Sequence, residues 1–200
     1  MSHAGTAMLL CFSVAWVMAA GRTCDVSQAP YNAPNDGKTI ATSALQQAID
    51  DCSTGNGGGG IVLLRSPGVY LTGSLNLRSH TILRVERGAT LLGSTDTSLY
   101  SEMPILPSYC VNRAGNRRLL GGDNVTDVRI EGGGTIDGGW ADFAHVVGVR
   151  LMQFRRSTDV HISGVRLQHS GSWTVHMWSC DRVSVVGCTI LNAITKGETD

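Results

Sequence analysis

Six carboxylates in the second half of the chain carry the most suggestive chemistry, because a pair of carboxylates can hydrolyse a glycosidic bond. One member of such a pair donates a proton to the leaving oxygen, and the other activates water or attacks the anomeric carbon. The six are Asp137, Asp142, Asp159, Asp181, Glu198 and Asp200. Asp159 and Asp181 precede strand-like segments, where a carboxylate commonly caps backbone N–H groups. The residues alone therefore select no catalytic pair.

Other side chains that could take part in catalysis or binding are weaker candidates for a functional site. The histidines His80, His145, His161, His169 and His176 are scattered and lack the spacing of metal ligands. Asp36-Gly37-Lys38-Thr39 resembles the end of a phosphate-binding loop, but Asn32 stands where that loop needs glycine. Trp140, Trp173 and Trp178 either stack on sugar rings or fill structural corners. The sequence thus predicts neither a metal site nor a nucleotide site.

A repeated phrase indicates the elements that position these residues. Segments 126–132, 158–164 and 181–187 each place apolar, mostly β-branched residues at alternate positions and end in glycine. The copies are offset by 32 and 23 residues (160 − 128 and 183 − 160). Alternation at period two is strand geometry, and units this short need stacked neighbours to complete a core. The pattern predicts an all-β parallel β-helix.

The remaining segments fit this solenoid. Apolar residues at helical spacing predict a helix over 41–52, opened by Ser43 and Gln46 as a capping box and covering the end of the stack. Strands are predicted from residue 61 onward, with residues 94–124 as a long surface loop. A glycine count of 25 and an aromatic content of 6% suit short strands joined by tight turns.

The N-terminus and the cysteines predict secretion. Residues 8–20 form an apolar run of signal-peptide length, so we expect a signal peptide over 1–21 and the β-helix over 22–200. Cys24 and Cys52 flank the predicted helix and are a possible disulfide. Asn124 opens an N-glycosylation sequon. The formal net charge is zero without a basic block, which favours neither nucleic acid nor a membrane surface as a partner.

Several motifs, in this order, resemble the polygalacturonases, which are pectin-hydrolysing glycoside hydrolases. They lie at residues 36–39 (DGKT), 44–50 (ALQQAID), 58–62 (GGGIV), 67–73 (PGVYLTG), 88–91 (GATL), 134–138 (GTIDG) and 172–176 (SWTVH). The resemblance implies a right-handed parallel β-helix and inverting hydrolysis of α-1,4 galacturonic linkages without a cofactor. Glu198-Thr199-Asp200 stands where the family has Asn-Thr-Asp, so the resemblance implies that Asp200 is a catalytic residue.

The same resemblance implies that this chain holds only the N-terminal portion of such an enzyme. The Asp-Asp, Gly-His-Gly and Arg-x-Lys motifs of the family are absent, so we expect a β-helix that is incomplete at its C-terminus and inactive alone. The complete protein is expected to be a secreted monomer acting on pectin in the extracellular space or cell wall. Two alternatives stay open: a non-catalytic carbohydrate-binding or structural solenoid, and a Ca²⁺-dependent lyase on the same scaffold.

Overall fold

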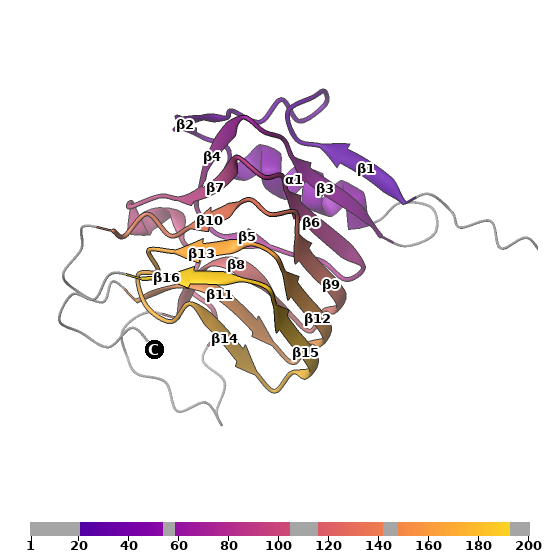
Figure 1. Cartoon of the computed structure of the whole chain (residues 1–200), viewed down its shortest axis with the longest axis vertical. Helices are drawn as coiled ribbons and strands as arrows, with labels where there is room; N and C mark the ends of the chain where they lie inside the picture. The colour runs from indigo at the N-terminus through magenta and orange to yellow at the C-terminus, as the bar shows by residue number, and fades with distance from the viewer. Residues whose placement is uncertain (1–20, 54–58, 105–115, 142–147, 193–200) are drawn as a thin grey trace, which may run out of the picture.

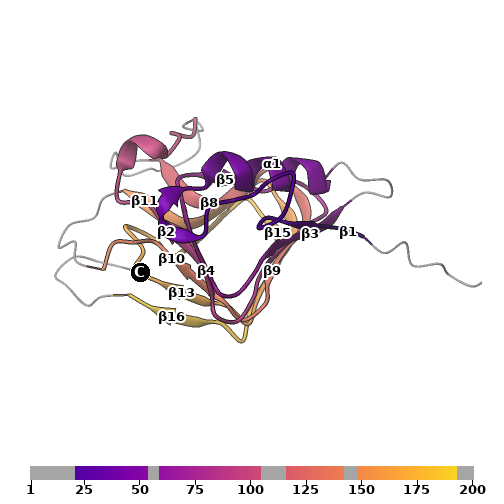
Figure 2. The same cartoon turned by 90° about the horizontal axis from the view of Figure 1, so that it is seen from above.

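The computed structural model describes residues 21–53, 59–104, 116–141 and 148–192. In this part of the chain, three parallel sheets wind around one core, and seen from above they enclose a triangle (Figures 1 and 2). Each turn of the chain visits the three sheets in succession, which is a right-handed parallel β-helix. The predicted fold class is confirmed.

Sheets A and B carry six strands each, and sheet C carries four. Sheet A consists of β1 (Arg22–Asp25), β3 (Gly60–Leu64), β6 (Thr81–Val85), β9 (Thr126–Glu131), β12 (Thr158–Ser163) and β15 (Asp181–Val186). Sheet B consists of β2 (Asp36–Ile40), β4 (Gly68–Thr72), β7 (Ala89–Gly93), β10 (Thr135–Asp137), β13 (Arg166–Gln168) and β16 (Thr189–Leu191). Sheet C consists of β5 (Leu75–Asn76), β8 (Arg117–Asp123), β11 (Val149–Arg155) and β14 (Val175–Trp178).

The apolar residues of the repeated phrase stack in continuous interior rows. One row of sheet A runs through Val62, Leu83, Ile130, Ile162 and Val185, and one row of sheet B through Tyr70, Leu91, Ile136, Leu167 and Ile190. The first four members of each row are fully buried, whereas Val185 and Ile190 are 42% and 50% exposed. Burial of each such side chain contributes about 1.5–3 kcal/mol, so stacking supplies the stability that no single coil has.

Helix α1 (Thr42–Ser53) covers the N-terminal end of the stack, as predicted (Figure 1). It buries Leu45, Ala48, Ile49 and Cys52, and a disulfide joins Cys52 to Cys24 of β1. Gln46 does not act as the expected capping-box residue. Its side-chain amide instead donates to the carbonyl of Asn76 (3.0 Å) and accepts from the N–H of Asn76 (2.8 Å), which satisfies the backbone of the edge strand β5.

Two strand predictions need correction. The predicted first strand, at residue 61, is preceded by β1 and β2. The predicted loop over residues 94–124 contains β8, a strand of sheet C. The sequence of β8 lacks the polar-apolar alternation of a strand, because most of its residues are buried. In addition, Gly121 and Gly122 resemble a turn.

From β6 onward, the coils differ in length mainly at one corner, whereas the coil from β1 to β3 spans 38 residues (60 − 22) and contains α1. Register partners in sheet A are separated by 47 residues between β6 and β9, 32 between β9 and β12, and 23 between β12 and β15. The extra residues lie in the connections from sheet B to sheet C, after β7 and after β10. None of the helices in the described residues is long and apolar enough to cross a membrane.

Candidate active-site face

Sheet C presents the most unusual surface of the molecule, because charged side chains are buried on it. The segment after β7 packs back against this sheet. The N–H of Met103 donates to the carbonyl of Asn116 (2.9 Å), and Arg155 donates to the carbonyl of Pro104 (2.8 Å). Every residue of β11 is buried, in contrast to the alternating burial along β9 and β12 of sheet A.

Three arginines lie together in this covered region. Arg118 and Arg150 are register partners on β8 and β11, and Arg155 ends β11. Their exposed fractions are 5%, 4% and 1%. Burial, with the charge of Arg155 as the second cause, lowers the pKa of Arg118 to about 10. The same two causes lower the pKa of Arg150. We call Arg118, Arg150 and Arg155 the arginine cluster.

Asp123 supplies the negative charge within the described part of this cluster. It forms ion pairs with Arg155 and with the exposed Arg156 (2.8 Å). Burial alone would raise the pKa of Asp123, but hydrogen bonds from Arg156 and Arg155 outweigh it, and the net pKa is lowered. Asp123 is therefore ionised at neutral pH. One carboxylate therefore serves two guanidinium groups here, those of Arg155 and Arg156.

An aromatic group adjoins the arginine cluster. The guanidinium carbon of Arg150 lies 5.0 Å from the ring centroid of Trp173, within cation–π range. The ring of His176 meets Trp173 edge-on at 4.4 Å between centroids. Gln153 and His176 are register partners, and Gln153 Nε2 lies 3.0 Å from His176 Nδ1. Burial lowers the pKa of His176, which makes it a neutral imidazole at pH 7.

This arrangement is suited to an anionic ligand with a ring that can stack. The guanidinium fork matches carboxylate geometry and is desolvated more readily than an ammonium group. The Nε atoms of Arg118 and Arg155 are buried without a hydrogen-bond acceptor in the described structure, and unsatisfied buried donors of this kind require an explanation. Trp173 is 38% exposed and offers an apolar ring at the edge of the cluster.

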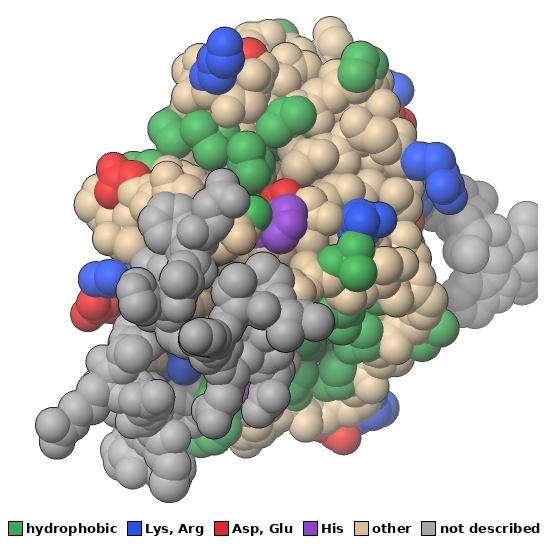
Figure 3. All heavy atoms as spheres, turned by 60° about the vertical axis from the view of Figure 1, so that its left-hand side comes forward, with side chains coloured by type: hydrophobic (Ala, Val, Ile, Leu, Met, Phe, Trp, Pro, Cys, Tyr) green, Lys and Arg blue, Asp and Glu red, His purple; other side chains and the backbone are tan. Residues whose placement is uncertain are grey.

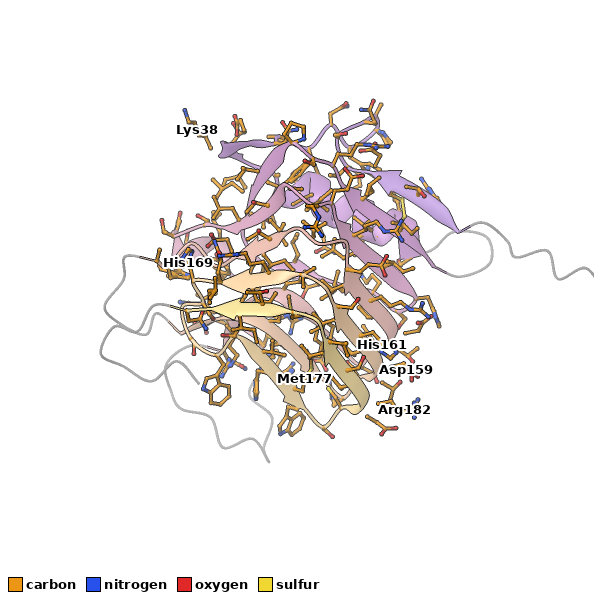
Figure 4. The ribbon with its side chains drawn as sticks, viewed as in Figure 1. Lys38, Asp159, His161, His169, Met177 and Arg182 are labelled. Atoms are coloured by element: carbon orange, nitrogen blue, oxygen red, sulfur yellow. A yellow bond between two sulfur atoms is a disulfide. The ribbon has the colours of Figure 1, made fainter. Side chains whose placement is uncertain are left out.

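Three of the six carboxylates considered in the sequence, Asp137, Asp159 and Asp181, have structural partners instead. Asp137 accepts from the N–H of Gly139 (2.8 Å) and from Gln168 (2.6 Å), and His169 lies 3.0 Å from it. Both oxygens of Asp159 accept from Arg182 at 2.7 Å, and Figure 4 shows these two side chains next to each other at the edge of sheet A. Asp181 also pairs with Arg182.

The residues predicted for the site are only partly within the described structure. Asp142, Glu198 and Asp200, the residue predicted to be catalytic, lie outside the described residues, as do His145 and the apolar segment 8–20. Cys24 and Cys52 are bonded, and Cys180 and Cys188 are free thiols. Asn124 is exposed between β8 and β9, where a glycan has room. Among the described residues, no group of three or more His, Cys, Asp or Glu could hold a metal ion.

The arginine cluster was not found from the sequence, although one signal for it was present. The 32-residue offset of the repeated phrase also separates Asp123 from Arg155 and superposes Arg118 on Arg150. Applying that offset to every residue, and not only to the apolar ones, would have brought the charges together. Arginine side chains usually lie at the protein surface, so a buried cluster of arginines was not expected.

The described residues form a parallel β-helix, and proteins that are similar to the chain include polygalacturonases. The chain is 35% identical over 192 residues to a probable polygalacturonase of Vitis vinifera, covering 90% of this chain and 39% of that protein. It is 36% identical over 146 residues to an exo-poly-alpha-D-galacturonosidase of Dickeya chrysanthemi, covering 66% of this chain and 23% of that protein.

The solved structures agree on the fold. A family 28 exopolygalacturonase of Yersinia enterocolitica superposes with a TM-score of 0.71 at 21% identity, over 87% of this chain and 39% of that chain. No protein-family model matches the chain. The resemblance to the polygalacturonases is therefore confirmed by relatives, and the chain spans about two fifths of the length of the Vitis vinifera protein.

Proposed function

We propose that this chain is the N-terminal part of a secreted polygalacturonase-like glycoside hydrolase, in which the outer face of sheet C binds the acidic polysaccharide. The observation that carries the proposal is the exposed ring of Trp173, with the buried arginine cluster beside it as a source of positive charge. The relatives named above are galacturonan hydrolases, and a polymer of uronic acids offers a carboxylate on every ring. The residues of sheet C then hold the chain of sugars by charge and by stacking.

Under this proposal, Asp200 is one of the carboxylates of an inverting site in the complete enzyme. Inversion needs two carboxyl groups about 6.5–9.5 Å apart with water between them. The family motif that would supply the general acid is absent from this sequence. We therefore expect the 200-residue protein to bind pectic oligomers without releasing reducing ends.

Titration of the purified protein with trigalacturonate in a calorimeter tests this proposal. We expect saturable binding that weakens as salt is raised, because the interaction is largely between charges. Trp173→Ala removes the exposed ring and should weaken binding about tenfold while the melting temperature stays within a few degrees. Arg118→Gln removes one buried positive charge and should weaken binding, whereas Arg87→Gln, a change at an exposed arginine of another surface, should leave it unchanged.

The outcome also separates the alternatives. Absence of binding in the wild-type protein would overturn the sheet C assignment. Binding accompanied by release of reducing ends would show that this chain is active alone. An unsaturated, ultraviolet-absorbing product that appears only with Ca²⁺ would favour the lyase alternative. Binding without turnover, even when Asp-Asp, Gly-His-Gly and Arg-x-Lys segments are supplied by fusion, would favour the non-catalytic solenoid.

The proposal of secretion is supported by the disulfide and by the apolar N-terminal run. Disulfides such as Cys24–Cys52 persist in oxidising compartments and are rare in the cytosol. Expression of the sequence from Met1 in a eukaryotic secretory host is expected to place the protein in the medium with its N-terminus near Arg22. Asn124→Asp should remove the mass of one glycan. Retention of residues 1–21 in the secreted protein would contradict the signal-peptide assignment.

A further inference from the structure

A second candidate site lies on sheet A and differs in chemistry from the arginine cluster on sheet C. It is built where the strands of sheet A begin. Gly59 and His80 directly precede β3 and β6, Asp127 is the second residue of β9, and all three have positive φ angles (99°, 61° and 52°). The carbonyl of His80 lies so near Gly59 that a Cβ there would approach it to 2.1 Å. Only glycine fits at this position, and the space beside it stays open.

This open space is a hollow of about 250 Å³. Its apolar part comes from Ile61 and Ile82, which are register partners on β3 and β6, and Arg129 continues the same row on β9. His80 and Asp127 supply further polar groups, and Gly21, Gly59 and Gly60 complete the lining. The volume is slightly below the range of drug-sized pockets, which fits a ligand of one ring.

The carboxylate of Asp127 is only loosely engaged. Its oxygens lie 3.4 Å from His80 Nδ1 and 3.5 Å from an Nη atom of Arg129, both at the outer limit of hydrogen bonding. Asp159 occupies the equivalent position one coil further on, with a φ of 55° in place of 52°. There the carboxylate accepts two bonds of 2.7 Å from Arg182. Asp127 therefore retains the acceptor capacity that Asp159 has already used.

We propose that this hollow binds a single neutral pyranose unit. A pyranose has an apolar face that fits against Ile61 and Ile82, and vicinal hydroxyl groups that donate to Asp127 and accept from Arg129. One carboxylate and one guanidinium offset each other in this hollow, in contrast to the arginine cluster on sheet C. The two surfaces would thus recognise different sugars, a neutral unit on sheet A and an acidic polymer on sheet C.

Saturation-transfer NMR with methyl α-D-galactopyranoside and methyl α-D-glucopyranoside tests the proposal on the purified protein. We expect transfer to at least one of these glycosides, with a dissociation constant in the millimolar range. Asp127→Asn should weaken it at least tenfold, because asparagine tolerates the positive φ but lacks the charge. Asp159→Asn is the matched control, since it changes the same backbone position outside the hollow, and it should leave binding within twofold of the wild type.

A second variant keeps the result interpretable. Ile82→Lys fills the apolar part of the hollow and should also abolish transfer. Absence of transfer to the wild-type protein, or an equal loss in the Asp159→Asn variant, would overturn the proposal. Binding of methyl galacturonate alone, strengthened by Asp127→Asn, would identify an anion site and overturn it as well. Trigalacturonate binding that survives Asp127→Asn but not Trp173→Ala would separate this site from the one on sheet C.

Discussion

Asp123 holds two guanidinium groups of very different exposure, since Arg155 is 1% exposed and Arg156 is 49% exposed. Removing a carboxylate that faces a buried cation leaves that cation without compensation, which typically costs several kcal/mol. The exposed partner contributes little by comparison, because solvent screens it. Asp123 therefore stabilises the fold mainly through its ion pair with Arg155.

Asp123→Asn is expected to lower the free energy of unfolding by about 2–3 kcal/mol at pH 7. Because folding lowers the pKa of Asp123, its contribution is present above the unfolded pKa of about 3.9 and is lost as the pH falls through the folded value. Urea midpoints at pH 7 and pH 3 should thus differ less in the variant than in the wild type. Asp181→Asn, at an exposed pair, is the control, and an equal effect there would contradict this account.

At the scale of elements, Gln46 connects the covering helix to sheet C. Two hydrogen bonds join its amide to the backbone of Asn76, and the Asn76 side chain accepts from Arg118 (2.7 Å). The helix therefore replaces the strand that β5 lacks on that side. It also fixes the residue that holds one member of the arginine cluster.

Gln46→Ala should lower the free energy of unfolding by about 1–3 kcal/mol, because it leaves a buried strand edge with unpaired backbone groups. Amide hydrogen exchange at Asn76 should accelerate in the same variant. Gln47→Ala, at the exposed neighbouring position of the same helix, should change neither quantity. Unchanged exchange at Asn76 in the Gln46→Ala variant would refute the proposed role of the amide.

The elements also show what the sequence could and could not predict. The strands of sheet A were predictable because one of their faces is buried and the other is not, so Val128 and Ile130 alternate with Asp127 and Arg129. Strand β8 was not predictable because the segment after β7 covers its outer face and removes the alternation. The arginine cluster was not predicted from the sequence for the same reason. Its burial depends on that tertiary cover, which local pattern does not encode.

On the scale of the whole molecule, the stack is closed at one end and open at the other. Helix α1 covers the first coil, whereas Val185, Val186, Ile190 and Leu191 of the last described coil are 42–64% exposed. Figure 3 shows hydrophobic side chains reaching the surface towards both ends of one face. Parallel strands with exposed apolar residues and unpaired edges pair readily with other chains.

We expect the 200-residue protein to self-associate in solution through the last described coil. Light scattering after size-exclusion chromatography should give a mass above one chain, and Val185→Lys with Ile190→Lys should shift it towards the monomer. Ile40→Lys, at an equally exposed position in the first strand of sheet B, should have no effect. A wild-type monomer at roughly 100 µM would contradict the expectation.

From β6 onward the length differences lie mainly at one corner, which has a consequence for how such proteins diversify. Register partners in sheet A stay aligned whether 47, 32 or 23 residues separate them, because the added chain leaves and re-enters at the connection from sheet B to sheet C. Lengthening a loop costs little entropy. Insertions can therefore change the segments that cover sheet C while the stacked interior rows stay the same. New binding specificities can arise in this way without a change of fold.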